Sequence, residues 1–148
     1  MSLGSIFDIA GSGMTAQSLR LNTTASNIAN AETASSSTDT TYRARKPVFA
    51  TLQQDMMNQG GASFGFGGNE GSGGGVKVDG IVESDAELQM RFQPDHPAAN
   101  EDGYVFYPNV NVVEEMADMM SASRGFQQNI DVMNTAKSMM QRILTLGQ

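Results

Sequence analysis

Three acidic residues of this 148-residue chain have the type and spacing for acid–base chemistry. Glu83, Asp85 and Glu87 alternate along one stretch and would project from one face of a strand. Paired carboxylates can act as general acid and base where their surroundings separate their pKa values. The sequence supplies neither a pocket nor a neighbouring hydrophobic wall for them, so we predict a solvated acidic face.

The run Asp95–Gly103 (DHPAANEDG) could belong to a calcium-binding loop. When its Asn-Glu-Asp-Gly is aligned with an EF-hand loop, Ala98 and Asn109 take the first and twelfth ligand positions. Both positions require a carboxylate, so an acidic turn is the better prediction. The chain's one histidine, His96, lies in this run without a second histidine to share a metal ion. We predict an exposed turn histidine, while Ser-His-Asp chemistry stays open because geometry, not order, defines it.

A glycine-rich run could suggest a phosphate-binding loop. Residues 60–75 contain nine glycines, but the chain has no G-x-G-x-x-G motif and no Gly-Lys-Ser/Thr motif. We therefore predict a flexible, low-complexity insertion over 60–75. Cysteine is absent, which excludes disulfides, thiolate zinc sites and a cysteine nucleophile. The residues thus predict no catalytic, cofactor-binding or metal-binding site.

The charge distribution restricts the class of partner. The net charge is −7 and the pI is about 4.5, which disfavours binding to a nucleic-acid backbone. Ten acids and one base lie between Asp79 and Asp118, which predicts a solvated face or contact with a basic partner. No run approaches the ~18 apolar residues of a membrane span. The first residues lack a basic region, so we expect no Sec-type signal peptide, and composition alone would predict a cytosolic protein.

The two ends of the chain predict long helices. Large apolar residues recur there every seven positions, with smaller or apolar companions at helical spacing. We expect Ser5 to begin the first helix, Asn30 to end it in a left-handed conformation, and Asn111 to begin the second. The candidate subunit-packing residues are Phe7, Met14, Leu21, Ile28, Val112, Met119, Phe126, Ile130, Met133 and Met140.

The middle of the chain predicts short strands. Apolar and polar residues alternate over 76–83 and 88–93, and Ser84–Ala86 could form the turn of a hairpin between them. Residues 42–50 and 104–107 are weaker strand candidates. The predicted fold is mainly α with a small β part. Its N-terminal helix (1–32) and C-terminal helix (111–148) pair as an antiparallel coiled coil, and a β-hairpin region (33–110) lies between them.

The composition of both helices favours packing against other subunits over an isolated helical hairpin. The first helix contains Gly11 and Gly13 with several Asn and Thr residues, which are poor or mediocre helix formers. The remaining faces carry few charges, unlike helices that face solvent. Six of the eleven methionines lie in the second helix, and methionine adapts to irregular surfaces.

Several segments resemble a known family. Gly13–Asn30 (GMTAQSLRLNTTASNIAN) resembles the N-terminal signature of the bacterial flagellar axial family, which comprises rod, hook and junction proteins. Ser121–Gln148 resembles that family's C-terminal helix, and Asp95–Met116 is similar to its proximal-rod members. The resemblance covers about residues 1–57 and 76–148.

The resemblance implies a structural subunit of the proximal rod of the flagellar basal body, with no enzymatic activity and no cofactor. The family's termini pair as the inner layer of a tube, and its subunits stack helically around an export channel. Such a rod crosses the periplasm and transmits motor torque, and its subunits leave through the type III export apparatus without a Sec signal peptide. The expected partners are copies of itself, neighbouring axial proteins, and the export apparatus or membrane ring base, with no nucleic acid and no small-molecule substrate.

Two other classes of function stay open from the residues alone. The chain could be a coiled-coil adapter or secreted binding protein that uses the same helical pairing. It could also be an acidic hydrolase that acts on cell-wall polysaccharide through the carboxylates of Glu83–Asp102.

Overall fold

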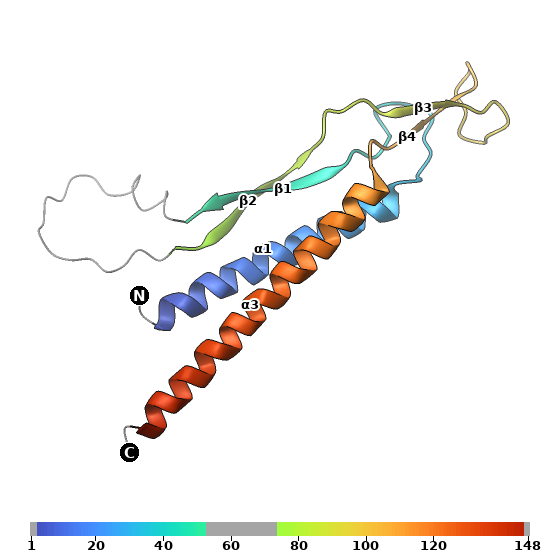
Figure 1. The fold of residues 1–148 in the computed structure, drawn as a ribbon. Coiled ribbons are helices and arrows are strands. Elements are labelled where there is room, and N and C mark those ends of the chain that lie inside the picture. Colours follow the sequence, from blue (N-terminus) through green and yellow to red (C-terminus); the bar gives the residue numbers. More distant parts are fainter. Residues whose placement is uncertain (1–2, 53–73, 147–148) are drawn as a thin grey trace, which may run out of the picture. The chain divides into compact units, whose positions relative to one another are not determined.

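A computed structural model describes residues 3–52 and 74–146. Two long helices of 28 and 35 residues dominate the described chain, and four short strands lie between them in sequence (Figure 1). The prediction of a mainly helical protein with a small β part is therefore confirmed. The elements follow in the order α1 (Leu3–Asn30), β1 (Arg45–Thr51), β2 (Val76–Glu83), β3 (Gln89–Phe92), β4 (Tyr104–Tyr107) and α3 (Val112–Leu146).

The chain divides into two compact units, each of which contains part of both helices. Unit 1 comprises residues 1–19, 48–80 and 122–148. Unit 2 comprises residues 20–47 and 81–121. Most of the predicted glycine-rich insertion, 60–75, lies outside the described residues.

The helix ends agree only in part with the sequence prediction. α1 includes Leu3, so Ser5 is inside the helix and is not its cap. α1 does end at Asn30, but no described non-glycine residue has a positive φ, so the left-handed ending is wrong. Instead the Asn30 carbonyl accepts bonds from the backbone N–H and the hydroxyl of Thr33, which satisfies an otherwise unpaired helix-end carbonyl. The cap of α3 is confirmed: Asn111 Oδ1 accepts a 3.2 Å bond from Val113 N.

The strands form two separate two-stranded sheets, β1 with β2 and β3 with β4. β3 and β4 are antiparallel, with Gln89 opposite Tyr107 and Phe92 opposite Tyr104. The predicted hairpin between residues 76–83 and 88–93 is therefore wrong, although both strands exist.

A side chain distant in sequence explains the difference. Asn109 Nδ2 donates to the carbonyl oxygens of Ser84 and Ala86, at 3.3 and 3.0 Å, and its Oδ1 accepts from Ala44 N at 2.8 Å. The backbone groups of residues 84–86 thus bond to Asn109 and Ala44, and the segment does not turn β2 back onto β3.

The core of unit 2 is small and partly polar. Val105 and Pro108 are among its fully buried side chains, and Val110 and Ala44 are also buried. Polar side chains complete it, and these are Thr23, Thr24, Asn27, Thr41 and Glu115.

In unit 1 a hydroxyl connects α1 to the start of β2. Ser12 Oγ donates to the Ile9 carbonyl at 2.8 Å and accepts from Val76 N at 3.2 Å. A Cβ at Gly75 would lie 2.7 Å from a methyl carbon of Leu52 and 3.2 Å from the Ser12 hydroxyl. Glycine at position 75 therefore permits close approach of the backbone to α1.

Candidate assembly surfaces

The predicted packing residues are not the most deeply buried positions of the two helices. In the isolated chain, all four in α1 are half-buried, as are five of the six in α3, while Met140 is exposed. The positions buried most completely are instead small or polar, and they are Ala10, Ala16, Thr23, Thr24 and Asn27 in α1 and Glu115, Ala122 and Ala136 in α3.

The contacts between the two helices use small and polar residues. In unit 1, Gly13 faces the side chain of Asn129, and Gly125 faces the side chain of Gln17. In unit 2, Arg20 forms a 2.7 Å ion pair with Asp118. Positions along α1 therefore meet positions in the reverse order along α3, as in antiparallel helices.

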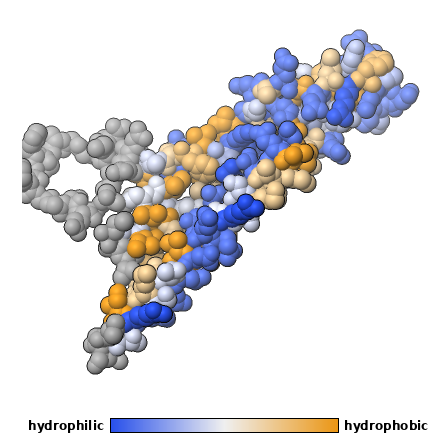
Figure 2. Space-filling model, in the orientation of Figure 1, coloured by the Kyte–Doolittle hydropathy of each residue, from blue (hydrophilic) through white to orange (hydrophobic). Residues whose placement is uncertain are grey.

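Large apolar side chains remain exposed along α3. Val113 is 76% exposed, Met116 52% and Leu144 67%. The hydropathy surface carries hydrophobic patches beside hydrophilic ones on the face that it presents (Figure 2). Larger exposed apolar surfaces of this kind mark interaction sites in soluble proteins. The other exposed apolar residues of α3 are Met120, Val132, Met139, Met140 and Ile143.

An apolar hollow of about 350 Å³ lies in unit 1. Ile6 of α1 lines it together with Val132, Ala136 and Met139 of α3. Ile6, Val132 and Met139 are not among the predicted packing residues, because those residues follow the seven-residue spacing that begins at Phe7 and not at Ile6. The signal was present in the sequence, since Val132 and Met139 are also seven positions apart.

A cluster of hydrogen bonds fixes the end of α1 to the chain that follows it. Asn27 is 1% exposed, and its Oδ1 accepts from Arg45 N and from the Tyr42 hydroxyl, each at 2.9 Å. Its Nδ2 donates to the Arg45 carbonyl at 2.8 Å. We call Asn27, Tyr42 and Arg45 the Asn27 cluster. From the sequence, Asn27 is recognised only as a weak helix former, and no local pattern predicts these bonds.

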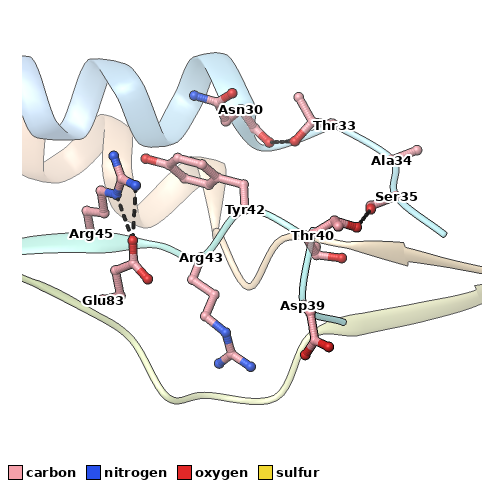
Figure 3. A pocket seen from close by; sticks show the side chains of 11 residues that line it. Asn30, Thr33, Ala34, Ser35, Asp39, Thr40, Tyr42, Arg43, Arg45 and Glu83 are labelled. Atoms are coloured by element: carbon pink, nitrogen blue, oxygen red, sulfur yellow. Dashed lines mark hydrogen bonds and ion pairs between the residues drawn. The ribbon is translucent and has the colours of Figure 1, made fainter. Parts of the chain in front are cut away.

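Beside this cluster lies a polar cleft of about 470 Å³ (Figure 3). Arg45 donates to Glu83 Oε1 from two nitrogens, at 3.1 and 3.0 Å, and its guanidinium carbon lies 5.4 Å from the centre of the Tyr42 ring. Arg43 donates to the Ser84 carbonyl at 3.2 Å. These charged groups are bonded to other groups of the chain, so the arrangement holds strands β1 and β2 together at this end.

The candidate chemical residues do not come together as a site. Asp85 and Glu87 are exposed, and Glu83 pairs with Arg45. His96 Nδ1 accepts a 3.1 Å bond from Ala98 N, so the histidine lies in a turn as predicted, but it is half-buried and not exposed. Over residues 3–52 and 74–146, no group of three or more acidic or histidine side chains could hold a metal ion.

The Asp95–Gly103 run forms a loop held by its own backbone bonds. Asn100 Oδ1 accepts from the N–H groups of Asp102 and Tyr104, so it faces the backbone. Gly103 has φ of +78°, which glycine adopts without the penalty of a side chain. Among the helices described, none is long and apolar enough to cross a membrane.

Comparison with known proteins identifies the chain's relatives. Residues 7–34 match the family model "Flagella basal body rod protein", and residues 101–146 match "Flagellar basal body rod FlgEFG protein C-terminal". The chain is 48% identical to the flagellar basal-body rod protein FlgC of Salmonella typhimurium, and the match covers all of both chains. It is 47% identical to FlgC of Escherichia coli O157:H7, again over all of both chains. It is 37% identical to FlgC of Borreliella burgdorferi over the whole chain and 99% of that relative.

The chain belongs to the FlgC family of flagellar basal-body rod proteins. FlgC proteins are structural subunits of the rod and not enzymes, which confirms the function expected from the resemblance. The adapter and hydrolase alternatives lose their support. All ten predicted packing residues lie within the two segments that the rod family models match.

Proposed function

We propose that this FlgC chain assembles helically with copies of itself and with neighbouring axial proteins into the proximal rod. The rod would be a hollow shaft that crosses the periplasm, transmits motor torque and surrounds the export channel. The chain would leave the cytoplasm through the type III apparatus without a Sec signal peptide, and would contact the export apparatus or the membrane ring base. The FlgC relatives support assembly in the basal-body rod. The exposed apolar surface of α3 supports packing against other subunits.

The single observation that carries the proposal is the exposed apolar surface of α3. A helix whose outer face stayed in contact with water would carry polar residues at the positions where Val113, Met116 and Leu144 are exposed. The lines that face the rest of the chain consist of small and polar residues, which leaves the larger side chains for other contacts. We infer that α1 and α3 pair as an antiparallel coiled coil and that the ten predicted residues pack against adjacent subunits.

The large apolar residues that recur every seven positions form one stripe on each helix, and they are Phe7, Met14, Leu21 and Ile28 on α1 and Val112, Met119, Phe126, Met133 and Met140 on α3. Charge substitutions within these stripes test the proposal. Leu21 and Phe126 are central in the two stripes and half-buried in the isolated chain. Burying a Leu or Phe stabilises an interface by roughly 1.5–3 kcal/mol, and an unpaired buried charge costs several kcal/mol more. We expect Leu21→Asp and Phe126→Asp each to abolish swimming of a bacterium whose own FlgC has been replaced by this chain, although the chain is still produced.

Matched controls add the same charge at the adjacent residue. Asn22 and Gln127 are both exposed, so Asn22→Asp and Gln127→Asp should leave swimming and the yield of isolated basal bodies unchanged. Normal swimming of both stripe variants would show that these residues do not pack in the rod. Imaging of isolated basal bodies carrying the chain would test the helical arrangement directly.

A further inference from the structure

Two glycines of unit 1 contact amide side chains across the helix pair. A Cβ built at Gly13 would lie 2.9 Å from Asn129 Nδ2 and 3.2 Å from its Oδ1. A Cβ built at Gly125 would lie 3.2 Å from both Cδ and Nε2 of Gln17. Real Cβ atoms rarely approach other atoms so closely, so a side chain at either glycine would require the facing amide of the other helix to move.

The two contacts are reciprocal. On α1 the amide of Gln17 follows Gly13 by four residues, and on α3 the amide of Asn129 follows Gly125 by four residues. Four residues are about one helical turn, so each glycine and amide lie on one face of their helix. In an antiparallel pair, each glycine then meets the amide of the other helix, as is observed.

Glycine is not used at these positions for its backbone freedom. Both lie inside α-helices, where glycine is a poor former, and neither has a positive φ. Gly11 lies one half-turn away on α1, and a Cβ there would meet nothing within 4 Å. The close packing is therefore specific to Gly13 and Gly125 among these three helical glycines.

The amide of Gln17 fills the space opposite Gly125. Its Oε1 is buried and has no hydrogen-bond partner among the described residues. A buried, unpaired carbonyl oxygen destabilises the folded state, so this atom does not stabilise the isolated chain. What the side chain supplies is volume opposite Gly125.

The large apolar stripes cannot by themselves fix how the helices align. Phe7, Met14 and Leu21 repeat every seven residues, and so do Met119, Phe126 and Met133. A slide of one helix by seven residues would superimpose each stripe on itself, so the stripes allow several registers. In coiled coils, a single polar residue in the contact line resolves this kind of ambiguity.

The reciprocal pairs distinguish these registers. A slide by seven residues would place Asn129 against Ile6 or Arg20 instead of Gly13. Either side chain would occupy the space that the glycine leaves open. We infer that the glycine–amide pairs, Gly13 with Asn129 and Gly125 with Gln17, act with the Arg20–Asp118 ion pair to set the register between α1 and α3 and thereby the alignment of the stripes along the rod.

A pairwise substitution series tests this inference, and its swimming readout rests on the proposed function. The chain, its variants and an empty control would be introduced into a bacterium that lacks FlgC. Gly13→Ala should reduce swimming, because overpacking shifts the equilibrium between the correct and the displaced register by roughly fivefold or more. Gly11→Ala is the matched control and should swim as the unaltered chain does, although both changes improve helix propensity equally.

Rescue should follow the observed pairs. Asn129→Ala should restore swimming to Gly13→Ala, and Gln17→Ala should not. Conversely, Gln17→Ala should restore Gly125→Ala, and Asn129→Ala should not. Gln17→Met keeps the volume and removes the unpaired oxygen, so it should swim normally. Equal rescue by matched and mismatched partners, or no loss in Gly13→Ala and Gly125→Ala, would overturn the inference.

A cross-linking measurement keeps the result independent of swimming. Because the chain has no cysteine, two can be introduced without background. Ile6 and Ala136 line the same hollow, so Ile6→Cys with Ala136→Cys should cross-link through a short bismaleimide in intact cells. In the Gly13→Ala background this yield should fall, and the yield of Ile6→Cys with Ile143→Cys should rise. An unchanged pattern would contradict the inference, whereas failure of the unaltered chain to restore swimming would contradict only the proposed function.

Discussion

Removal of the Asn27 side chain should destabilise unit 2 more than any other single amide truncation in α1. Asn27 is 1% exposed and makes three side-chain hydrogen bonds, of 2.8–2.9 Å, to Arg45 and Tyr42. Each such bond contributes roughly 0.5–1.5 kcal/mol net, and buried partners left unpaired add to the loss. We therefore expect Asn27→Ala to lower the free energy of unfolding of unit 2 by about 3 kcal/mol.

The chain provides its own probe for this measurement. It has no tryptophan, and its three tyrosines, Tyr42, Tyr104 and Tyr107, all lie in unit 2. Tyrosine fluorescence of the full chain during a urea titration therefore reports on unit 2. A small unit loses about 1 kcal/mol of stability per molar urea, so the midpoint should fall by about 2–3 M.

Asn30 supplies the control. It is the same residue type, three positions further along α1, and its Nδ2 makes one local bond to the Ser26 carbonyl at 2.8 Å. Asn30→Ala should therefore lower the free energy of unfolding by about 1 kcal/mol or less. If the two variants shift the midpoint equally, the three bonds of Asn27 do not stabilise unit 2 and the reasoning is wrong.

Two further changes test other parts of the chain. Gly103→Ala should lower the stability of unit 2 by roughly 1–3 kcal/mol, because φ is +78° and the added Cβ would lie 2.9 Å from the Phe92 ring. The same urea titration measures this loss. An unchanged midpoint would show that alanine at position 103 causes no backbone strain. Brief proteolysis of the isolated chain should remove residues 3–19 and 122–146 before residues 81–110, because lone helices of weak formers are marginal in water. Mass spectrometry would identify the fragments, and amide exchange would measure the same order of protection. Equal protection of the helical segments and of residues 81–110 would show that the helices are stable without assembly.

The sequence predicted the helices well because their signal is local and repeated. Seven-residue spacing of large apolar side chains requires a helix over each end, and the observed bounds, Leu3–Asn30 and Val112–Leu146, lie close to those expected. The same spacing did not reveal the buried line of each helix. Alanine, glycine and threonine recur at helical spacing too, and their small size makes the pattern weak in any hydropathy analysis.

Strand pairing could not be read from local pattern. Alternation correctly placed β2 and β3, but their pairing partners depend on Asn109, whose bonded backbone groups lie 23 to 65 residues away in sequence. A side-chain amide that bonds to distant backbone leaves no periodic trace. The exposure of the acidic residues, in contrast, could be predicted without knowing any distant contact. Carboxylates for which the sequence predicts no pocket are expected to be exposed, as Asp85 and Glu87 are.

The weak helix formers of α1 have two different physical explanations, one for the part of the helix in each unit. In unit 2, Asn27 forms three buried hydrogen bonds that an aliphatic residue could not replace. In unit 1, Gly13 gives up helix propensity to admit the Asn129 amide. Neither feature buries a large apolar side chain. Leu21 and Phe126 are half-buried in the isolated chain, so under the proposed function they would bury their remaining apolar surface against other subunits, and part of the hydrophobic stabilisation would then be gained only when the rod forms.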